Sequence, residues 1–268
     1  MLPNRLAPRT TARRRLAHLA RLALVSATAA SASAWALQPL ITDDTGTQGT
    51  GGHQLELAFG HDRIRASDAR DTAHTWTPTY TYGATDTLDL FLSTSRISLR
   101  GDSGRASGWG STVLGAKWRL WENEASATSL ALKPELLLPV GHRREAAGLG
   151  VGRASGAITA IVSQAMPFGA LHANGTWARD RARDAAASST MQRLSIAPVW
   201  DLNEQWKLVG DLGVERHRTA GTPSERHRFT EVGAIYSPRT DLDLAAGLVR
   251  TVGVHSSHRS TTATLGVT

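Results

Sequence analysis

The feature that most constrains the fold of this chain is a two-residue alternation of apolar and other side chains. In the stretch TLDLFLS, at residues 87–93, three leucines alternate with Asp89, Phe91 and Ser93. A period of two places the leucines on one face of a strand and the other side chains on the opposite face. The alternation recurs from residue 53 to the end of the chain. We find no amphipathic helix there and no apolar run of about 18 residues that would form a membrane helix.

The connections between the alternating segments also alternate, in length. We predict twelve strands, at residues 53–62, 73–83, 87–99, 109–120, 127–139, 155–166, 170–180, 190–200, 205–216, 226–236, 241–251 and 260–268. Connections after the even-numbered strands are short, and most of the others are longer and rich in Arg, His, Gly and Ser. Short periplasmic turns, longer outer loops and an even strand number are typical of bacterial outer-membrane barrels. The sequence therefore predicts an all-β fold, a transmembrane antiparallel up-and-down β-barrel of about 12 strands.

Aromatic side chains gather at both ends of the predicted strands. Six lie beside the short turns, namely Tyr82, Trp121, Phe168, Trp200, Trp206 and Tyr236, and five lie near the long loops, namely Phe59, Trp76, Trp109, Trp177 and Phe229. Two aromatic belts are what the two interfaces of a bilayer select in a barrel. Aromatic residues that merely favour strands would be scattered along them instead.

Residues 1–36 have the three parts of a secretory signal peptide. A basic start with six arginines precedes the small apolar run LALVSATAASASAWA, which ends in an A-x-A site at residues 34–36. We expect cleavage after Ala36, with residues 32–34 as an alternative site. About 232 residues then remain, enough for one large all-β domain.

Removal of the signal peptide changes the electrostatic argument. The whole chain has a formal net charge of +7, but the loss of six arginines leaves about +1 on the remainder. A strongly basic domain would favour nucleic-acid binding, whereas a nearly neutral one does not, so we expect no nucleic-acid partner. The chain has no cysteine, which excludes disulfides and thiolate chemistry.

The strand face opposite the leucines collects charged side chains and is the predicted lumen. The candidate lining residues are five bases and seven acids: Glu56, Asp89, Lys117, Arg119, Lys133, Glu135, Arg193, Lys207, Asp211, Glu215, Glu231 and Asp243. A charge that faces lipid near the midplane costs about 2–4 kcal/mol, so these groups are expected to face inward. There they either neutralise one another and fill the interior or line a pore, and the sequence leaves both possibilities open.

Arginines concentrate in and beside the long loops, whereas all three lysines lie within predicted strands. This arginine rim includes Arg63, Arg65, Arg70, Arg100, Arg105, Arg143, Arg144, Arg153, Arg181, Arg183, Arg216, Arg218 and Arg226. Because the forked guanidinium suits phosphate, one hypothesis is that the rim binds the phosphates of outer-leaflet lipopolysaccharide. A solvated loop surface is the alternative.

Residues 37–52 are expected to form a periplasmic N-terminal segment before the outer-membrane barrel at 53–268. They contain the stretch TDDTGTQGTGG, whose glycines resemble a phosphate-binding loop. Such a loop requires a Lys-Ser/Thr pair and then a helix, but here His53 and Gln54 lead into a strand. The glycines and aspartates suit turns. The segment either leads directly into the first strand or folds into the lumen and narrows it.

No catalytic, cofactor-binding or metal site is predicted. The histidines lack the i, i+4 helical spacing of a catalytic zinc site, and His142, His255 and His258 would meet only if their loops folded together. A lipid hydrolase would need a serine with a histidine and an orienting group. We find no G-x-S-x-G elbow, and His172 beside Asn174 is a pair expected by chance. We therefore expect a protein without enzymatic activity or cofactor.

Two segments carry a family resemblance. The positions that match are Pro39, Thr42, Asp43, Asp44, Gly46 and Thr47 in the first segment, and Leu138, Pro139, Gly141, Gly148, Leu149, Gly150 and Gly152 in the second. With these motifs the chain resembles the outer-membrane transporter family labelled MetA-pathway of phenol degradation. The resemblance implies a signal peptide and a barrel that passes small compounds, aromatic ones among them, and implies no catalytic residues. One departure is the terminal Thr268, where such barrels usually carry an aromatic residue.

We therefore expect an exported protein of the cell outer membrane that acts as a passive channel or transporter for small, aromatic or hydrophobic, molecules. Its expected partners are outer-membrane lipid, lipopolysaccharide and a small solute. A plugged structural or adhesive barrel that acts through Arg-rich outer loops is the alternative, and an outer-membrane lipid hydrolase is a more remote one. The solute and the oligomeric state stay open.

Overall fold

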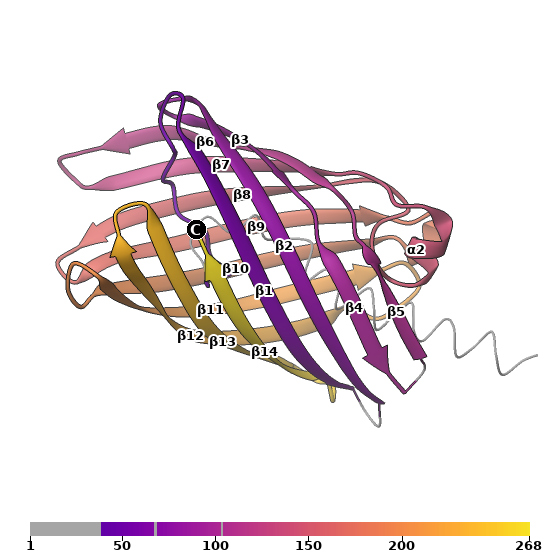
Figure 1. Cartoon of the computed structure of the whole chain (residues 1–268). Coiled ribbons are helices and arrows are strands. Elements are labelled where there is room, and N and C mark those ends of the chain that lie inside the picture. Colours follow the sequence, from indigo (N-terminus) through magenta and orange to yellow (C-terminus); the bar gives the residue numbers. More distant parts are fainter. Residues whose placement is uncertain (1–38, 67–68, 103) are drawn as a thin grey trace, which may run out of the picture.

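The strands form one closed antiparallel sheet. The computed structural model describes residues 39–66, 69–102 and 104–268, so the predicted signal peptide and its cleavage site lie outside the described residues. β1 (His53–Ala66) pairs with β2 (Ala69–Thr85) on one side and with β14 (Arg259–Val267) on the other, which closes the sheet into a barrel (Figure 1).

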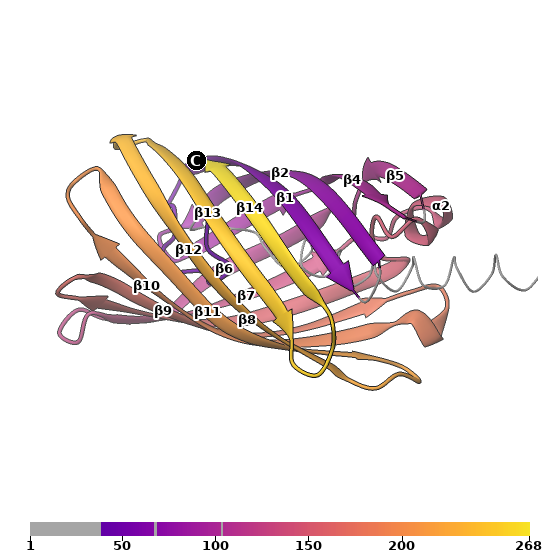
Figure 2. The ribbon, with the colours of Figure 1, turned by 90° about the horizontal axis from the view of Figure 1, so that it is seen from below.

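The other elements follow one another around the barrel in chain order. They are β3 (Leu88–Ser93), β4 (Arg96–Gly101), β5 (Gly104–Trp109), β6 (Val113–Asn123), β7 (Thr128–Leu137), α2 (His142–Ala146), β8 (Arg153–Met166), β9 (Gly169–Arg181), η1 (Ala185–Ala187), β10 (Ser189–Asp201), β11 (Trp206–Thr219), β12 (Glu225–Arg239) and β13 (Leu242–Gly253). Figure 2 shows β12, β13, β14 and β1 side by side along one wall. No helix among these elements has the length and apolar character needed to cross a membrane.

The fourteen β elements of the described chain occupy twelve positions around the barrel. β3 and β4 both pair with β2, one after the other, while β6 pairs with β3 and β5 pairs with β4. The predicted twelve-strand barrel is therefore confirmed. The predicted loop at 100–108 is wrong, because most of it continues the wall as the β4–β5 hairpin. Its Gly, Ser and Arg residues favour a loop by composition, but cross-strand backbone pairing outweighs that local preference.

The strands extend beyond the length that a bilayer requires. β1 and β2 contain 14 and 17 residues, whereas a tilted membrane strand needs about 9–11. The predicted long loop at 62–72 is consequently mostly strand. The short turns gather at one end of the barrel, on the left in Figure 1, and α2 lies at the other end within the connection 138–152.

The alternation of side chains is the one expected from the sequence. Leu90, Leu212 and Leu248 lie on the outer face and are about half exposed, whereas Asp89 and Asp211 lie on the inner face and are buried. One predicted belt residue is misplaced. Phe229 is only 3% exposed and points inward, where it covers Gly213, its register partner on β11. A glycine without a side chain leaves the space that the inward ring fills.

Candidate functional site: the lumen and its N-terminal segment

The N-terminal segment, described from residue 39 to residue 52, lies inside the barrel. It joins β1 at the short-turn end, where the N–H of Gly51 donates to the carbonyl of Gly83 (2.8 Å) and the N–H of Gly83 donates to the carbonyl of Gly52 (2.9 Å). Gly49 and Gly51 have φ values of +73° and +77°, which other residues rarely adopt. A Cβ on Gly83 would lie 1.8 Å from the carbonyl oxygen of Gly49. The glycines therefore permit a turn pressed against the inner wall.

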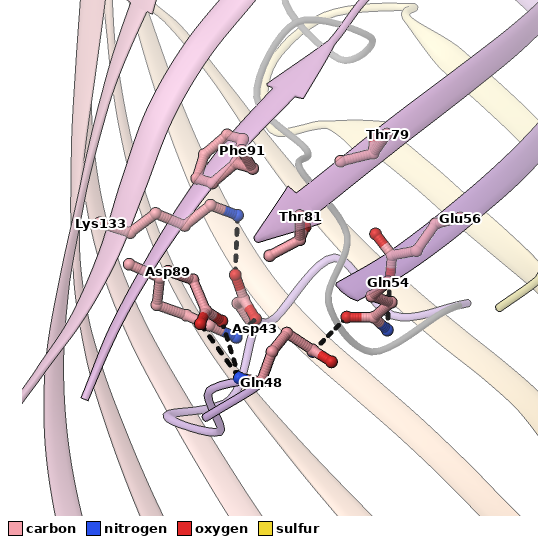
Figure 3. Close-up of a pocket in the computed structure, with 10 residues that line it drawn as sticks. Asp43, Gln48, Gln54, Glu56, Thr79, Thr81, Asp89, Phe91 and Lys133 are labelled. Carbon is pink, nitrogen blue, oxygen red and sulfur yellow. Dashed lines mark hydrogen bonds and ion pairs between the residues drawn. The ribbon is translucent and has the colours of Figure 1, made fainter. Parts of the chain in front are cut away.

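Two acids near the β2–β3 turn hold the next part of the segment. The N–H and hydroxyl of Thr50 both donate to Asp86 Oδ1, at 3.0 and 2.6 Å. The N–H of Gln48 donates to the carboxylate of Asp89, at 3.0 and 3.2 Å (Figure 3). A charged acceptor makes each of these hydrogen bonds stronger than one between neutral groups.

Asp43 pairs with two lysines of the adjacent strands β6 and β7, next to β3. Its Oδ2 lies 2.7 Å from Lys133 Nζ, and its Oδ1 lies 3.5 Å from Lys117 Nζ. Lys133 Nζ also stands 5.2 Å from the centre of the Phe91 ring, a cation–π contact. Figure 3 shows Asp43 between the lysine and the polar side chains of β1 and β2. Burial by itself would raise the pKa of Asp43, but the two ammonium charges outweigh it and hold that pKa below its ordinary value.

Threonines and one amide fix the centre of the segment. Thr42 donates through its N–H to Asp211 Oδ2 (2.7 Å) and lies within hydrogen-bond distance of Ser195 Oγ (2.6 Å). Thr45 donates through its N–H to Ser163 Oγ (3.0 Å). The side-chain oxygen of Asn174 accepts from the N–H of Asp43 (2.6 Å), and its NH₂ donates to the carbonyl of Asp43 (2.9 Å). The segment therefore bridges β6 and β7 to β9, β10 and β11 across the lumen.

The start of the described segment packs against an apolar part of the inner wall. Leu40 is 2% exposed and lies in a cluster with Ala197, Val199, Val209, Ile235 and Ala245. Pro39 lies over two glycines that face each other in the β12–β13 ladder, Gly233 and Gly247. A Cβ on either glycine would stand 2.7–2.8 Å from the proline ring. These two glycines form a recess for the segment.

Little free space remains where the segment meets β1, β2 and β3. The cavity there has a volume of about 20 Å³ and is lined by Asp43, Gln48, Gln54, Glu56, Thr79, Thr81, Asp89, Phe91, Lys117 and Lys133. Such a volume holds about one water molecule. With the segment in place, this cavity is too small for an organic solute.

The twelve sequence-predicted lining residues are distributed over three environments. Eight are buried: Glu56, Asp89, Lys117, Lys133, Glu135, Arg193, Asp211 and Glu231. Among them, Asp89, Lys117, Lys133 and Asp211 make hydrogen bonds or ion pairs with the N-terminal segment. Arg119, Lys207 and Glu215 are partly exposed and Asp243 is exposed. Asp243 accepts a hydrogen bond from Ser237 (2.5 Å) near the β12–β13 turn, apart from the other candidates.

Several polar contacts that hold the segment gave no signal in the sequence. Thr42 is a position of the family motif, but neither it nor Thr45 or Asn174 indicates its partner, which is far away in the chain. For example, Thr42 and Asp211 are 169 positions apart. The hydrogen bonds that these uncharged side chains make could therefore be found only from the three-dimensional structure.

A serine and a histidine meet inside the barrel. Ser163 Oγ and His172 Nδ1 lie 2.8 Å apart, a contact of the kind used by nucleophilic hydrolases. The Ser163 oxygen also accepts from Thr45. Asn174, which stands two residues from the histidine, bonds to the backbone of Asp43 instead of orienting the imidazole. The pair thus anchors the segment.

Comparisons with known proteins agree with this architecture. Among solved structures, an outer membrane channel from Pseudomonas putida F1 superposes with a TM-score of 0.67 at 19% identity, over 85% of this chain and 98% of that chain. The transport unit of the autotransporter AIDA-I from Escherichia coli superposes with a TM-score of 0.55 at 10% sequence identity, over 94% of this chain and 97% of that chain. The NanC porin superposes with a TM-score of 0.53 at 7% sequence identity, over 79% of this chain and 98% of that chain. These similarities show a barrel fold of the outer-membrane type.

A comparison with curated proteins gives no match. The sequence model of the family described as "Putative MetA-pathway of phenol degradation" matches residues 41–267, which include most of the N-terminal segment and every strand position. Of the two sequence motifs that resemble the family, the one at 138–152 lies within this match, and the one at 39–47 begins two residues before it. The chain therefore belongs to the MetA-pathway of phenol degradation family.

Proposed function

We propose that the protein is a passive outer-membrane channel for small molecules, and that the N-terminal segment sets the width of its lumen. The observation that carries this proposal is a closed barrel with a charged, polar interior in which the segment is held only by non-covalent contacts. Twelve strands enclose a lumen that side chains alone can nearly fill. A segment that crosses such a lumen decides whether a solute can pass.

The apolar patches of the interior favour a small aromatic or otherwise hydrophobic solute. Phe91, Val113, Leu137 and Val151 form one buried cluster, and the wall around Leu40 forms another. Sites for small organic molecules are mostly apolar, with a few polar groups that orient the ligand. The family label points in the same direction, although fold and family alone do not define a solute.

The proposed orientation places the short turns in the periplasm and the long connections outside the cell. The expected signal peptide would export the chain, and residues 37–52 would enter the barrel from the periplasmic end. Residues 53–268 would then form the membrane domain. This arrangement would put the arginine rim at the outer leaflet.

The arginine rim contains like charges placed directly opposite each other in the ladders. The pairs are Arg65 with Arg70, Arg100 with Arg105, Arg153 with Arg181, and Arg216 with Arg226. Like charges in direct cross-strand positions destabilise a sheet, so an anionic partner would offset the repulsion. We propose the phosphates of lipopolysaccharide as that partner, because paired guanidinium groups suit phosphate. Substitution of these eight arginines by glutamine should weaken lipopolysaccharide binding, and unchanged binding would refute this part.

A plugged structural or adhesive barrel is the second candidate, and the cavity of about 20 Å³ beside the segment favours it. Conductance in planar bilayers and solute uptake by liposomes separate the two. The channel proposal expects discrete conductance from the full mature protein and a larger conductance after deletion of residues 39–50. A folded barrel that shows neither conductance nor uptake, with or without the segment, would instead support the plugged barrel.

A further inference from the structure

Two imidazoles and a carboxylate meet toward the long-loop ends of β11 and β12. Glu215 and His227 are register partners across the two strands, and His217 follows two positions later on β11. The ring centres of His217 and His227 are 5.4 Å apart. One ligand atom from each of the three residues lies within 4.8 Å of the other two. Strand register brings them together, since 217 and 227 have no metal-binding spacing in the sequence.

The surroundings hold these side chains in place. Glu215 Oε2 lies 3.0 Å from His217 Nε2, while Arg193 Nε donates to Glu215 Oε1 at 2.6 Å. One carboxylate oxygen is thus fixed by the arginine and the other faces the imidazole. Partners of this kind orient ligands in metal sites and raise their affinity.

His227 supplies the strongest sign that a ligand belongs here. Its side chain is 2% exposed, and its Nε2 has no hydrogen-bond partner among the described residues. The nearest carboxylate oxygen, from Glu225, lies 3.9 Å away. A buried polar nitrogen without a partner destabilises the folded state, so a ligand that binds it would be favoured. The ring of His258 packs against it with a centre-to-centre distance of 4.8 Å and limits its movement.

We propose that Glu215, His217 and His227 bind one divalent transition-metal ion of the Zn²⁺ class. Two imidazoles and one carboxylate suit Zn²⁺, Ni²⁺ or Cu²⁺, whereas Mg²⁺ and Ca²⁺ prefer oxygen ligands alone. Ligand atoms around one tetrahedral zinc stand about 3.4 Å apart, given bonds of about 2.0–2.1 Å. Glu215 and His217 already stand 3.0 Å apart, so the ion needs only the wider separations of the trio, at most 4.8 Å, to shorten to this spacing. The bound ion would join β11 to β12 and leave a coordination position for water or a solute.

The test uses the full mature protein without a polyhistidine tag, folded in detergent and freed of metal with a chelator. Zn²⁺ binding is measured by calorimetry, and Co²⁺ is used as a probe because its visible absorption reports coordination by nitrogen ligands. We expect one ion per chain. Loss of a residue that only hydrogen-bonds to a metal ligand typically weakens metal affinity by about 10- to 100-fold. The variants His217→Gln and His227→Gln remove a ligand itself, so each should weaken Zn²⁺ binding by at least that much. Heat-dependent mobility in gel electrophoresis confirms that each variant is folded.

A second pair of histidines in contact provides the matched control. His61 and His74 face each other across β1 and β2, with their Nδ1 atoms 3.4 Å apart. The double variant His61→Gln/His74→Gln should bind Zn²⁺ as the parent does. The proposal is overturned if the folded parent binds no Zn²⁺, if His217→Gln and His227→Gln bind it like the parent, or if the control variant loses it.

Discussion

The pairing of Asp43 with two lysines can be tested by Asp43→Asn, which removes one negative charge and little volume. In the parent protein the Asp43 carboxylate lies 2.7 Å from Lys133 Nζ and 3.5 Å from Lys117 Nζ. The substitution removes this negative charge from both lysines. All three side chains are at most 7% exposed. Removal of one partner of a buried ion pair costs about 3–5 kcal/mol. The ratio of docked to undocked N-terminal segment should therefore fall by about two to three and a half orders of magnitude.

Single-channel recordings at neutral pH provide the first assay. The Asp43→Asn protein should show larger or longer open states than the parent, because the segment leaves the lumen more often. A cysteine placed at Thr42, which is 1% exposed, provides the second assay in a chain without native cysteine. It should be protected from maleimide in the parent background and labelled in the Asp43→Asn background.

Asp44→Asn is the matched control. The Asp44 carboxylate is more exposed and stands 3.7 Å from Lys117 Nζ, so the same substitution one position later should cost less than about 1 kcal/mol. The asparagine oxygen can still accept from the N–H of Gly46, as the carboxylate does. The reasoning would be refuted if Asp43→Asn matched both the parent and this control in conductance and in labelling.

Three further outcomes follow from the geometry. Because nearby ammonium charges lower the pKa of Asp43, docking is stable above the ordinary carboxylate pKa of about 3.9 and is lost as the pH falls through the lowered pKa. Conductance should thus rise as the pH falls below about 4, and bilayer recordings at decreasing pH check it. Gly247→Ala puts a methyl 2.8 Å from the proline of the segment, so it should increase proteolysis of the segment, whereas Gly60→Ala, with 3.9 Å to its nearest neighbour, should not. Leu194→Arg places a charge on the outer face in the middle of β10, where the residue is 66% exposed. It should lower the free energy of unfolding by about 2–4 kcal/mol, as measured by urea titration of the protein in liposomes. The control Leu202→Arg lies in a turn, where the residue is 63% exposed, and should lower it by only about 0–1 kcal/mol.

The barrel could be predicted from the sequence because its signal is local. In TLDLFLS the side chains alternate between lipid and lumen at every residue, and the structure places Leu90 and Leu92 outside and Asp89 inside. A charged side chain that faces lipid near the midplane costs free energy, which favours this alternation in the membrane-spanning parts of the strands. The β4–β5 hairpin was missed because Gly, Ser and Arg carry no such alternation, although their backbone groups still pair.

The contents of the lumen could be predicted only in part. Their charge and their place in the two-residue alternation predict that Lys133 and Asp211 face inward. Their partners Asp43 and Thr42, however, are 90 and 169 positions away. No periodicity links such positions. Phe229 was assigned to an aromatic belt because its place near a strand end says nothing about the glycine opposite it on β11.

The course of the N-terminal segment has a consequence for how the barrel closes. β1 must pair with β14, whose residues follow it by about 200 positions, and joining such distant strands carries a large entropy cost. The segment runs directly into β1 and already touches β6 and β7 as well as the late strands β10 and β11. If these contacts of the segment form early in folding, they would keep the first strand near the last ones. Loss of its anchors should delay the final seam during folding, even where the finished barrel is equally stable.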